Sequence, residues 1–462
     1  MNGSPAVDLI AAEALTRQPE RSLPLAPSGR LRQHVLDRVT VSADGQTQAL
    51  QLVAHTGLGF EPNYLWLTDA PQPRFFAVVA PGYYSLVQAP WQAVLGQRQK
   101  LAQATLERQR AAEWLKPLPG LTVVRNARVF DSLAARLGPA SDVYILRSRI
   151  MAVMPAGAVP PQAPDTTIDA AGRVMLPGLF DMHDHAWRGN GGLHLAAGVT
   201  STRDMANDNA ELQRLIDDAA AGQLAYPQVV PAGIIEGESA FSYRQAFVIQ
   251  TLDQARAAVD WYAQRGYPQI KIYNSFPKEH LRETVAYAHA RGLRVSGHVP
   301  AFLRADDVLD AGFDEIQHVN QLLLNFWVTP QTDTRTLERF TLPAQRLGEL
   351  DLDSAPVQAF IARLARQATV VDLIGMTPAQ ALQVATVNGA RYTRTLDDRG
   401  SITPGKRADL VLVDGEPTKN IDDIRRVALV ITQGKWLAPR EVHEAIGVAP
   451  FVATTPTVTP SR

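Results

Sequence analysis

The stretch VMLPGLFDMHDHAW, residues 174 to 187, decides how the rest of the chain is interpreted. An apolar run leads into His183 and His185, which stand two positions apart. In a β-strand this spacing directs both imidazoles to one face, so that both could reach the same metal ion. Two histidines at this spacing also arise by chance, and the alternative is a pair of ordinary hydrogen-bonded side chains. Further ligands at the ends of later strands would decide between the two.

The composition limits the classes of protein to be considered. A chain of 462 residues is long enough for two or three domains, or for one large barrel with additions. Apolar residues make up 46% and charged residues 20%, as in ordinary globular proteins. The 45 Lys and Arg nearly balance the 46 Asp and Glu. This balance argues against a nucleic acid or an anionic membrane as partner.

The absence of cysteine narrows the chemistry further. It excludes disulfides, cysteine-ligated zinc and a cysteine nucleophile, so a metal site must use histidine, carboxylate or a modified lysine. No run of 18 apolar residues occurs, and the N-terminus lacks a basic start followed by an apolar core. We therefore expect a soluble protein. The cytoplasm and an exported, periplasmic location with the signal peptide removed both fit this composition.

Turn residues and short alternating strands divide the flanks of the chain. We expect residues 1–118 to form an α+β domain, with strands at 50–53, 64–67 and 75–79 and a helix at 91–114. Short strands also recur in residues 121–174 and 401–445, which predicts a small β-sandwich built from both flanks. The Thr-Pro-rich tail, 446–462, is predicted to be disordered.

Strand and helix patterns alternate in the middle of the chain, residues 175–400. The predicted strands are 174–182, 198–203, 229–235, 269–273, 294–298, 315–319 and 368–372, and the predicted helices are 211–221, 252–265, 278–291 and 305–311. Such alternation is typical of parallel strands joined by helical crossovers. The fold class is therefore α/β, with a TIM-like (β/α) barrel in which only seven strands can be counted. Its chemistry is expected at the C-terminal ends of the strands.

Three more candidate ligands stand at those strand ends. Lys271 lies in QIKIY, His298 ends RVSGHV, and His318 lies near the end of EIQHV. A buried lysine is costly unless it is neutral, and beside two cations it could react with CO2 to give a bridging carbamate. The alternatives are that Lys271 pairs with an acid, and that the two histidines are hydrogen-bonded core residues.

LPGLFDMHDH, the lysine on the fourth strand, the single histidines on the fifth and sixth, and GSITPGKRADLVLVDG together resemble the amidohydrolase superfamily. Within it, the resemblance is to the imidazolonepropionase-like and Xaa-Pro dipeptidase-like branch, and it covers about residues 121–440. It implies a metal-dependent hydrolase that cleaves C–N bonds of amide, lactam or dipeptide substrates through a metal-bound hydroxide. His183 and His185 would bind one divalent metal, His298 and His318 a second, and carbamylated Lys271 would bridge the two. Zinc is expected, with Mn, Co or Ni as alternatives.

The sequence departs from this family at the end of the barrel. An Asp expected at the end of strand eight is not found, because ATVVD at strand seven runs directly into LIGMTPAQALQVATVNGARY. One interpretation gives the catalytic role to Asp372, with a seventh strand displaced or supplied by residues 321–350. The other is an open barrel in a catalytically impaired relative that keeps a metal or ligand site.

The remaining site residues are less specific. Arg203, Tyr273 and Asn274 follow strand ends and could contact a small-molecule or dipeptide substrate, although Arg203 could equally pair with an acid. Asp184 alternates with the two histidines and is expected to point away from the metal. A homo-oligomer is left open by the sequence.

Overall fold

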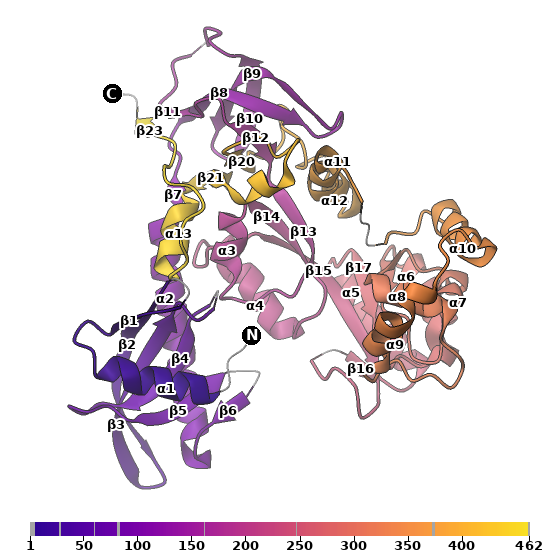
Figure 1. Ribbon diagram of the computed structural model, residues 1–462, viewed down its shortest axis with the longest axis horizontal. Coiled ribbons are helices and arrows are strands. Elements are labelled where there is room, and N and C mark those ends of the chain that lie inside the picture. The colour runs from indigo at the N-terminus through magenta and orange to yellow at the C-terminus, as the bar shows by residue number, and fades with distance from the viewer. Residues whose placement is uncertain are drawn as a thin grey trace.

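The structure is a computed structural model that describes residues 5–26, 29–59, 61–80, 84–160, 162–245, 247–371 and 375–460. It contains three sheets, which Figure 1 shows along the chain from indigo to yellow. None of the helices in the described ranges is long and apolar enough to cross a membrane.

The first sheet is antiparallel and lies in the N-terminal part of the chain. Its six strands follow one another in sequence order: β1 (Ser22–Pro24), β2 (Arg30–Ala43), β3 (Gln46–Thr56), β4 (Asn63–Thr68), β5 (Phe75–Ala80) and β6 (Tyr84–Leu86). Helix α1 (Pro5–Thr16) and the long helix α2 (Gln92–Trp114) pack against it. Trp66 is fully buried in this sheet, and its indole N–H donates to Gln99 of α2 over 3.1 Å.

The second sheet is built from both flanks of the chain, as Figure 1 shows at the top. Its strands are β7 (Lys116–Pro117), β8 (Leu121–Asp131), β9 (Arg136–Leu146), β10 (Arg149–Pro155), β11 (Thr166–Asp169), β12 (Val174–Pro177), β20 (Leu410–Val413), β21 (Val427–Thr432), β22 (Lys435–Leu437) and β23 (Val458–Pro460). Strand β12 pairs with β8 on one side and with β20 on the other. The flanks therefore meet in the middle of one sheet.

The end of the chain differs from the expected disorder. After helix α13 (Pro439–Ala445), strand β23 pairs antiparallel with β11, and Val458 packs on the apolar cluster of the second sheet. The backbone of the three residues of β23 pairs with a strand edge that would otherwise be open, and Val458 and Thr459 have the β-branched side chains that suit a strand.

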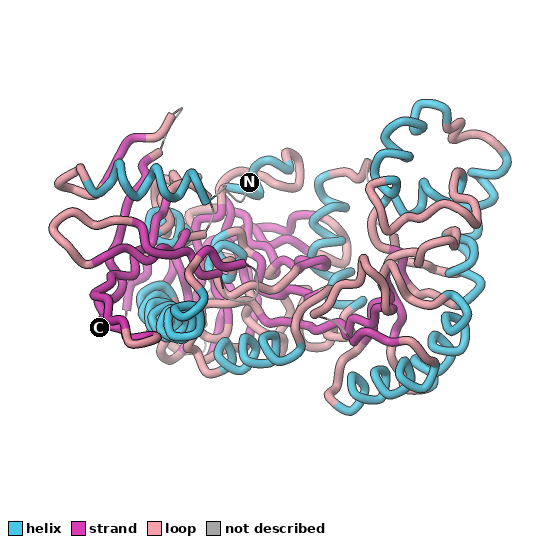
Figure 2. Tube along the Cα trace, turned by 90° about the horizontal axis from the view of Figure 1, so that it is seen from below, coloured by secondary structure: helices cyan, strands magenta, loops and turns pink. Residues whose placement is uncertain are grey.

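The third sheet is parallel and carries the strands predicted in the middle of the chain. It comprises β13 (Leu179–Asp184), β14 (Val199–Asp204), β15 (Gln228–Gly237), β17 (Gln269–Ile272), β18 (Arg294–Gly297) and β19 (Glu315–Ile316) in this order, with β16 (Phe247–Ile249) beside β15. Helices α3 (Gly191–Ala196), α4 (Asn209–Ala220), α5 (Leu252–Gln264), α6 (Leu281–Ala290) and α7 (Ala305–Ala311) connect them. Figure 2 shows these helices flanking the strands.

The stretch predicted as one strand, 174–182, is divided between two sheets. Val174–Pro177 belongs to the second sheet and Leu179–Asp184 to the parallel one, with Gly178 between them. A Cβ at Gly178 would lie 2.0 Å from the Thr200 hydroxyl oxygen on β14. Only glycine allows this close approach, and the chain can therefore pass directly from one sheet into the other.

The parallel sheet is a curled half-barrel rather than a closed ring of described strands. In place of the predicted strand at 368–372, only Val370 forms a single parallel bridge with Glu315, and Asp372 lies outside the described residues. The proposal that residues 321–350 supply a seventh strand was wrong. Their described elements are α8 (Val319–Leu323), α9 (Glu338–Arg346) and the short 3-10 turns Leu324–Phe326 and Leu347–Glu349.

Helical segments continue from there to the second sheet. They are α10 (Ala355–Arg366), α11 (Pro378–Gln383), the π-turn Val384–Asn388 and α12 (Gly389–Tyr392). The π-turn and α12 contact β13, at the opposite edge of the sheet from β19. A Cβ at Gly389 would lie 2.7 Å from Cβ of Phe180, so glycine is required for this contact.

Candidate metal centre

The four predicted histidines lie together although they come from opposite edges of the parallel sheet. β13 and β19 are the two end strands, yet the ring centroids of His183, at the end of β13, and His318, directly after β19, are 4.7 Å apart. His298 lies 4.8 Å from His318, and His185 lies 5.5 Å from His183. The curl of the sheet therefore brings all four imidazoles to one place.

Two of these imidazoles are oriented by hydrogen bonds at Nδ1. His298 Nδ1 lies 2.7 Å from the side-chain oxygen of Asn274, and His185 Nδ1 lies 3.1 Å from the main-chain oxygen of Ala206. Both partners are acceptors, so each Nδ1 carries the proton and each Nε2 keeps its lone pair. This is the tautomer in which a histidine binds a metal through Nε2.

Two ring nitrogens in the centre are buried without a hydrogen-bond partner among the described residues. They are Nε2 of His183 and Nε2 of His298. Burial, together with the positive charge of Lys271, lowers the pKa of His183 to about 3, and the same causes hold that of His298 well below its ordinary value. Both rings are therefore neutral near pH 7. Neutral imidazoles with buried, unsatisfied nitrogens fit the ligand set of a divalent cation.

Lys271 lies in the same place with its side chain almost fully enclosed, at 1% exposure. Its ammonium nitrogen stands 5.3 Å from the centre of the Tyr273 ring, which in turn lies 4.4 Å from the ring of His298. Burial lowers the pKa of Lys271 to about 7. A substantial fraction of this lysine is unprotonated at neutral pH, which is the form that reacts with CO2. The alternative, a pairing of Lys271 with an acid, has no hydrogen bond or ion pair among the described contacts, although the charges of Asp204 and Glu315 act on this lysine.

His318 has an unusual backbone. Its φ of 68° and ψ of 120° lie outside the regions that a side chain with a Cβ adopts without strain. Such strain costs on the order of 1–3 kcal/mol and is characteristic of functional sites. Here it turns the imidazole toward His183 and His298 at the point where β19 ends and α8 begins.

Sequence reasoning missed Asp204, a carboxylate at the end of β14. Its side chain is fully buried, and one oxygen accepts the N–H of Ala186, the residue after His185, over 2.8 Å. The other oxygen, Oδ2, has no hydrogen-bond partner among the described residues. Burial raises the pKa of Asp204 to about 7, although the charge of Lys271 acts in the opposite direction. Its position at a strand end, directly after Arg203, is the signal that could have found it.

Asp184 belongs to a second group of possible ligands. It forms a group with Asp181 and His194 whose possible ligand atoms all lie within 4.8 Å of one another. Asp184 also accepts a hydrogen bond of 3.3 Å from the hydroxyl of Tyr226, and burial raises its pKa. This second group of side chains could also hold a cation.

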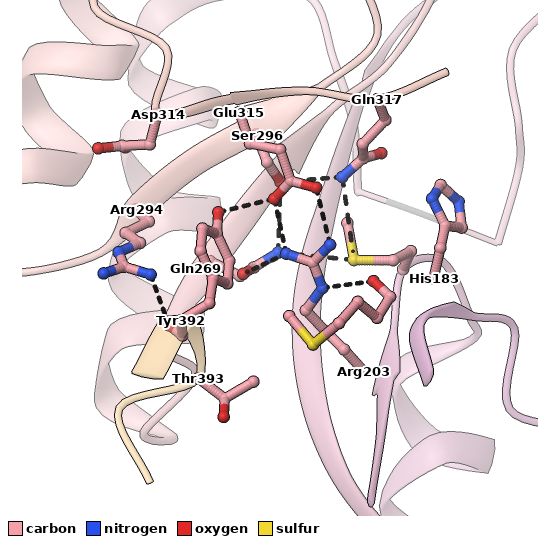
Figure 3. Close-up of polar contacts among 12 residues, drawn as sticks. His183, Arg203, Gln269, Arg294, Ser296, Asp314, Glu315, Gln317, Tyr392 and Thr393 are labelled. Atoms are coloured by element: carbon pink, nitrogen blue, oxygen red, sulfur yellow. Dashed lines mark hydrogen bonds and ion pairs between the residues drawn. The ribbon is translucent and has the colours of Figure 1, made fainter. Parts of the chain in front are cut away.

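Arg203 is not available to a substrate, because it is buried in an ion pair below the imidazoles. Two of its nitrogens donate to the two carboxylate oxygens of Glu315, over 2.6 and 2.7 Å. A third donates to the main-chain oxygen of Met182 over 2.7 Å, and Tyr392 donates its hydroxyl to Glu315 over 2.6 Å (Figure 3). This network joins β14, β19 and α12 and fixes the residue that precedes His183.

Known proteins resemble this chain in sequence. The sequence pattern of the Amidohydrolase family matches residues 349–437. An adenine deaminase of Chelativorans sp. (strain BNC1) is 28% identical over 335 residues, covering 63% of this chain, and an imidazolonepropionase of Deinococcus radiodurans is 25% identical over 325 residues, covering 55% of this chain and 80% of its own length. The chain is similar, over part of its length, to proteins of the amidohydrolase superfamily.

Solved structures show a similar fold. A Xaa-Pro dipeptidase with bound methionine is 20% identical, with a TM-score of 0.54 over 69% of this chain and 100% of its own. A molinate hydrolase is 16% identical, with a TM-score of 0.52 over 70% of this chain and 96% of its own. The chain spans just over half the length of the adenine deaminases that it matches, 54% in the case from Chelativorans.

Proposed function

We propose that the protein is a metal-dependent hydrolase that cleaves a C–N bond in a small amide, lactam or dipeptide substrate. The observation that carries the proposal is the meeting of four imidazoles and a buried lysine at one end of the parallel sheet, with two buried Nε2 atoms lacking a partner. Adenine deaminase, imidazolonepropionase and Xaa-Pro dipeptidase, the relatives named above, all act on C–N bonds. Their activities support the reaction class and leave the substrate open.

The side chains divide into two halves of a binding site. His183 and His185 would hold one divalent cation and His298 and His318 a second, with Lys271 as a carbamate between them. Bound cations of this kind lower the pKa of water toward neutrality and polarise the substrate carbonyl, and zinc suits imidazole ligands best. Asn274 and the main chain at Ala206 keep His298 and His185 in the required tautomer.

A proton acceptor is also needed, since the attacking water must lose a proton and the leaving nitrogen must gain one. Among the described acids, Asp204 is the best candidate for this proton acceptor. Its Oδ2 has no hydrogen-bond partner, and its pKa of about 7 allows it to take and return a proton near neutral pH. Asp372, the candidate from the sequence, lies outside the described residues.

The domain division supports the same function. We propose that residues 175–400 form the hydrolase unit, a (β/α) barrel that lacks its last strands, and that 121–174 with 401–445 form one composite β-sandwich. Residues 1–118 would be an additional α+β domain. The pairing of β12 with β8 and β20 supports the composite sandwich.

A second candidate function is a catalytically impaired relative that binds a metal or small ligand. The half-barrel favours it, because the parallel strands in the described ranges end at β19. No described residue takes the place of the family's strand-eight aspartate. Loss of a proton-transfer group typically costs about 10²- to 10⁴-fold in rate.

Metal analysis combined with a substrate screen tests both candidates. The purified protein is expected to hold two equivalents of transition metal and to hydrolyse at least one member of a panel of lactams, dipeptides and N-acyl amides. H183A and K271A should lose both properties, whereas H280A, which removes a histidine outside the centre, should keep them. Two bound metals without turnover would favour the second candidate, and a metal content unaffected by H183A and K271A would contradict both.

A further inference from the structure

A cavity lies between the N-terminal sheet and the parallel sheet, away from the imidazoles. Helix α2 contributes Glu107, Arg110 and Trp114 to its wall, β4 contributes Tyr64, and the segment after β13 contributes Arg188 and Leu193. Its volume is about 40 Å³. This corresponds to roughly three water-sized spheres, which is enough for a small polar ligand.

Arg110 is the unsatisfied charge in this cavity. Its side chain is half-buried, and its guanidinium lies 5.5 Å from the centre of the Trp114 ring. No hydrogen bond or ion pair joins it to any residue in the described ranges. Burial lowers its pKa, but an arginine stays protonated in proteins. The nearby acids Glu113 and Glu107 attract its charge without a direct ion pair, so that its five N–H donors are left for a ligand.

The acidic residue in the wall is already neutralised. Glu107 accepts two hydrogen bonds from Arg188, over 2.9 and 2.7 Å, and Arg188 also pairs with Asp218 over 2.8 Å. Burial raises the pKa of Tyr64 to about 12, so its hydroxyl keeps its proton at neutral pH. The cavity therefore holds one arginine that has no directly bonded acid, beside neighbours that are neutral or already paired.

We propose that this cavity binds a small oxyanion, through a carboxylate or phosphate group held by the guanidinium of Arg110. The planar fork of an arginine matches two oxygens of such a group, and the low polarity of the surrounding wall strengthens the pair. The ligand would lie between α2 and the segment that follows His183 and His185. The proposal does not depend on hydrolase activity, because none of its residues belongs to the candidate metal centre.

Titration calorimetry of the full chain tests the proposal, with inorganic phosphate and acetate as probes and sodium chloride to hold the ionic strength constant. Wild-type protein is expected to bind at least one of the two oxyanions. The one that binds more tightly shows whether the cavity accepts a phosphate or a carboxylate group. R110Q should weaken that binding by about tenfold or more, as expected for a hydrogen bond to a charged group. R108Q makes the same change of charge at an exposed position of the same helix and should bind as wild type.

Binding of phosphate at the metal centre would be equally strong in wild type and R110Q, so the difference between them reports on the cavity alone. If R110Q does not fold, L193F narrows the cavity from the opposite wall with Arg110 intact, and it should show the same loss. The proposal would be overturned if phosphate and acetate gave no more heat than chloride. It would also be overturned if R110Q and L193F both bound the oxyanion as tightly as wild type.

Discussion

The side-chain oxygen of Asn274 lies 2.7 Å from Nδ1 of His298, and this bond sets the face that His298 turns toward the other imidazoles. Partners of this kind typically contribute 10- to 100-fold to metal affinity. We expect N274A to weaken binding of the more loosely held metal by about this factor, measured by competition with a chromogenic chelator. N209A removes an amide that bonds Tyr262 instead and should leave the affinity unchanged. Equal affinities for the two variants would contradict the role assigned to Asn274.

The buried pair of Arg203 and Glu315 predicts a large effect on stability. R203M leaves the Glu315 carboxylate buried without its partner, which typically costs about 3–5 kcal/mol. Urea unfolding of the metal-free protein would measure the loss. R214M breaks an exposed pair with Glu211 and should cost no more than about 1 kcal/mol. The double variant R203M/E315L removes both charges and should recover part of the stability. If it is as unstable as R203M, the unpaired Glu315 carboxylate is not the cause of the loss.

Asp204 predicts a pH dependence of stability with a defined sign. Its pKa is raised in the folded protein from 3.8 to about 7, so the folded state holds the proton more tightly than the unfolded chain. The resulting stabilisation is fully present below pH 3.8 and is lost as the pH rises through about 7. D204N should therefore gain stability relative to wild type across this range, by at most roughly 4 kcal/mol.

The measurement is urea unfolding of chelator-treated wild type and D204N between pH 4 and pH 8. The buried histidines change stability in the opposite direction over part of this range, because their pKa values are lowered. They are common to both proteins, and the difference between the two curves isolates Asp204. D353N, at an exposed acid, should run parallel to wild type. If the free energy of unfolding of D204N also changes with pH as that of wild type does, Asp204 is not held protonated in the folded protein.

The contact of α12 with β13 predicts an intolerance of any side chain at Gly389. G389A would place a methyl group 2.7 Å from Cβ of Phe180 and push the helix away from the strand. Overpacking of this kind typically costs about 1–3 kcal/mol, which exceeds the gain in helix propensity. G348A adds the same methyl group where nothing lies within 4 Å. Thermal unfolding should show a lower midpoint for G389A alone, and equal midpoints would contradict the close contact.

The sequence predicted the imidazole-bearing strands well because their signals are local. His183, His298 and His318 each end an apolar run, and a parallel arrangement puts such ends at one edge of a sheet. The same logic would have found Asp204, the last residue of β14, but the sequence prediction named only Arg203 at this strand end. Its partner Glu315 lies 112 positions further along the chain, and no local pattern predicts a bond of that separation.

The far side of the sheet could not be predicted in the same way. The run at 368–372 has the β-branched residues of a strand. Among its described residues only Val370 pairs, because the neighbouring strand β19 is just two residues long. The helices in residues 321–350 were missed because α8 is only five residues long and α9 carries Pro343 in its interior, which argues against a helix. The split at Gly178 was missed as well, because an uninterrupted apolar run does not reveal which sheet each half joins.

The curl that brings the two end strands together has a mechanical consequence. His183 and His318 belong to opposite margins of an open sheet, so the two proposed cations, bridged by carbamylated Lys271, would link the two margins across the gap. Cross-links between distant segments restrict the unfolded chain most when the loop they close is long. Here that loop would run from residue 183 to residue 318, through the whole set of parallel strands. Metal loading would then govern the integrity of the half-barrel itself as well as its chemistry.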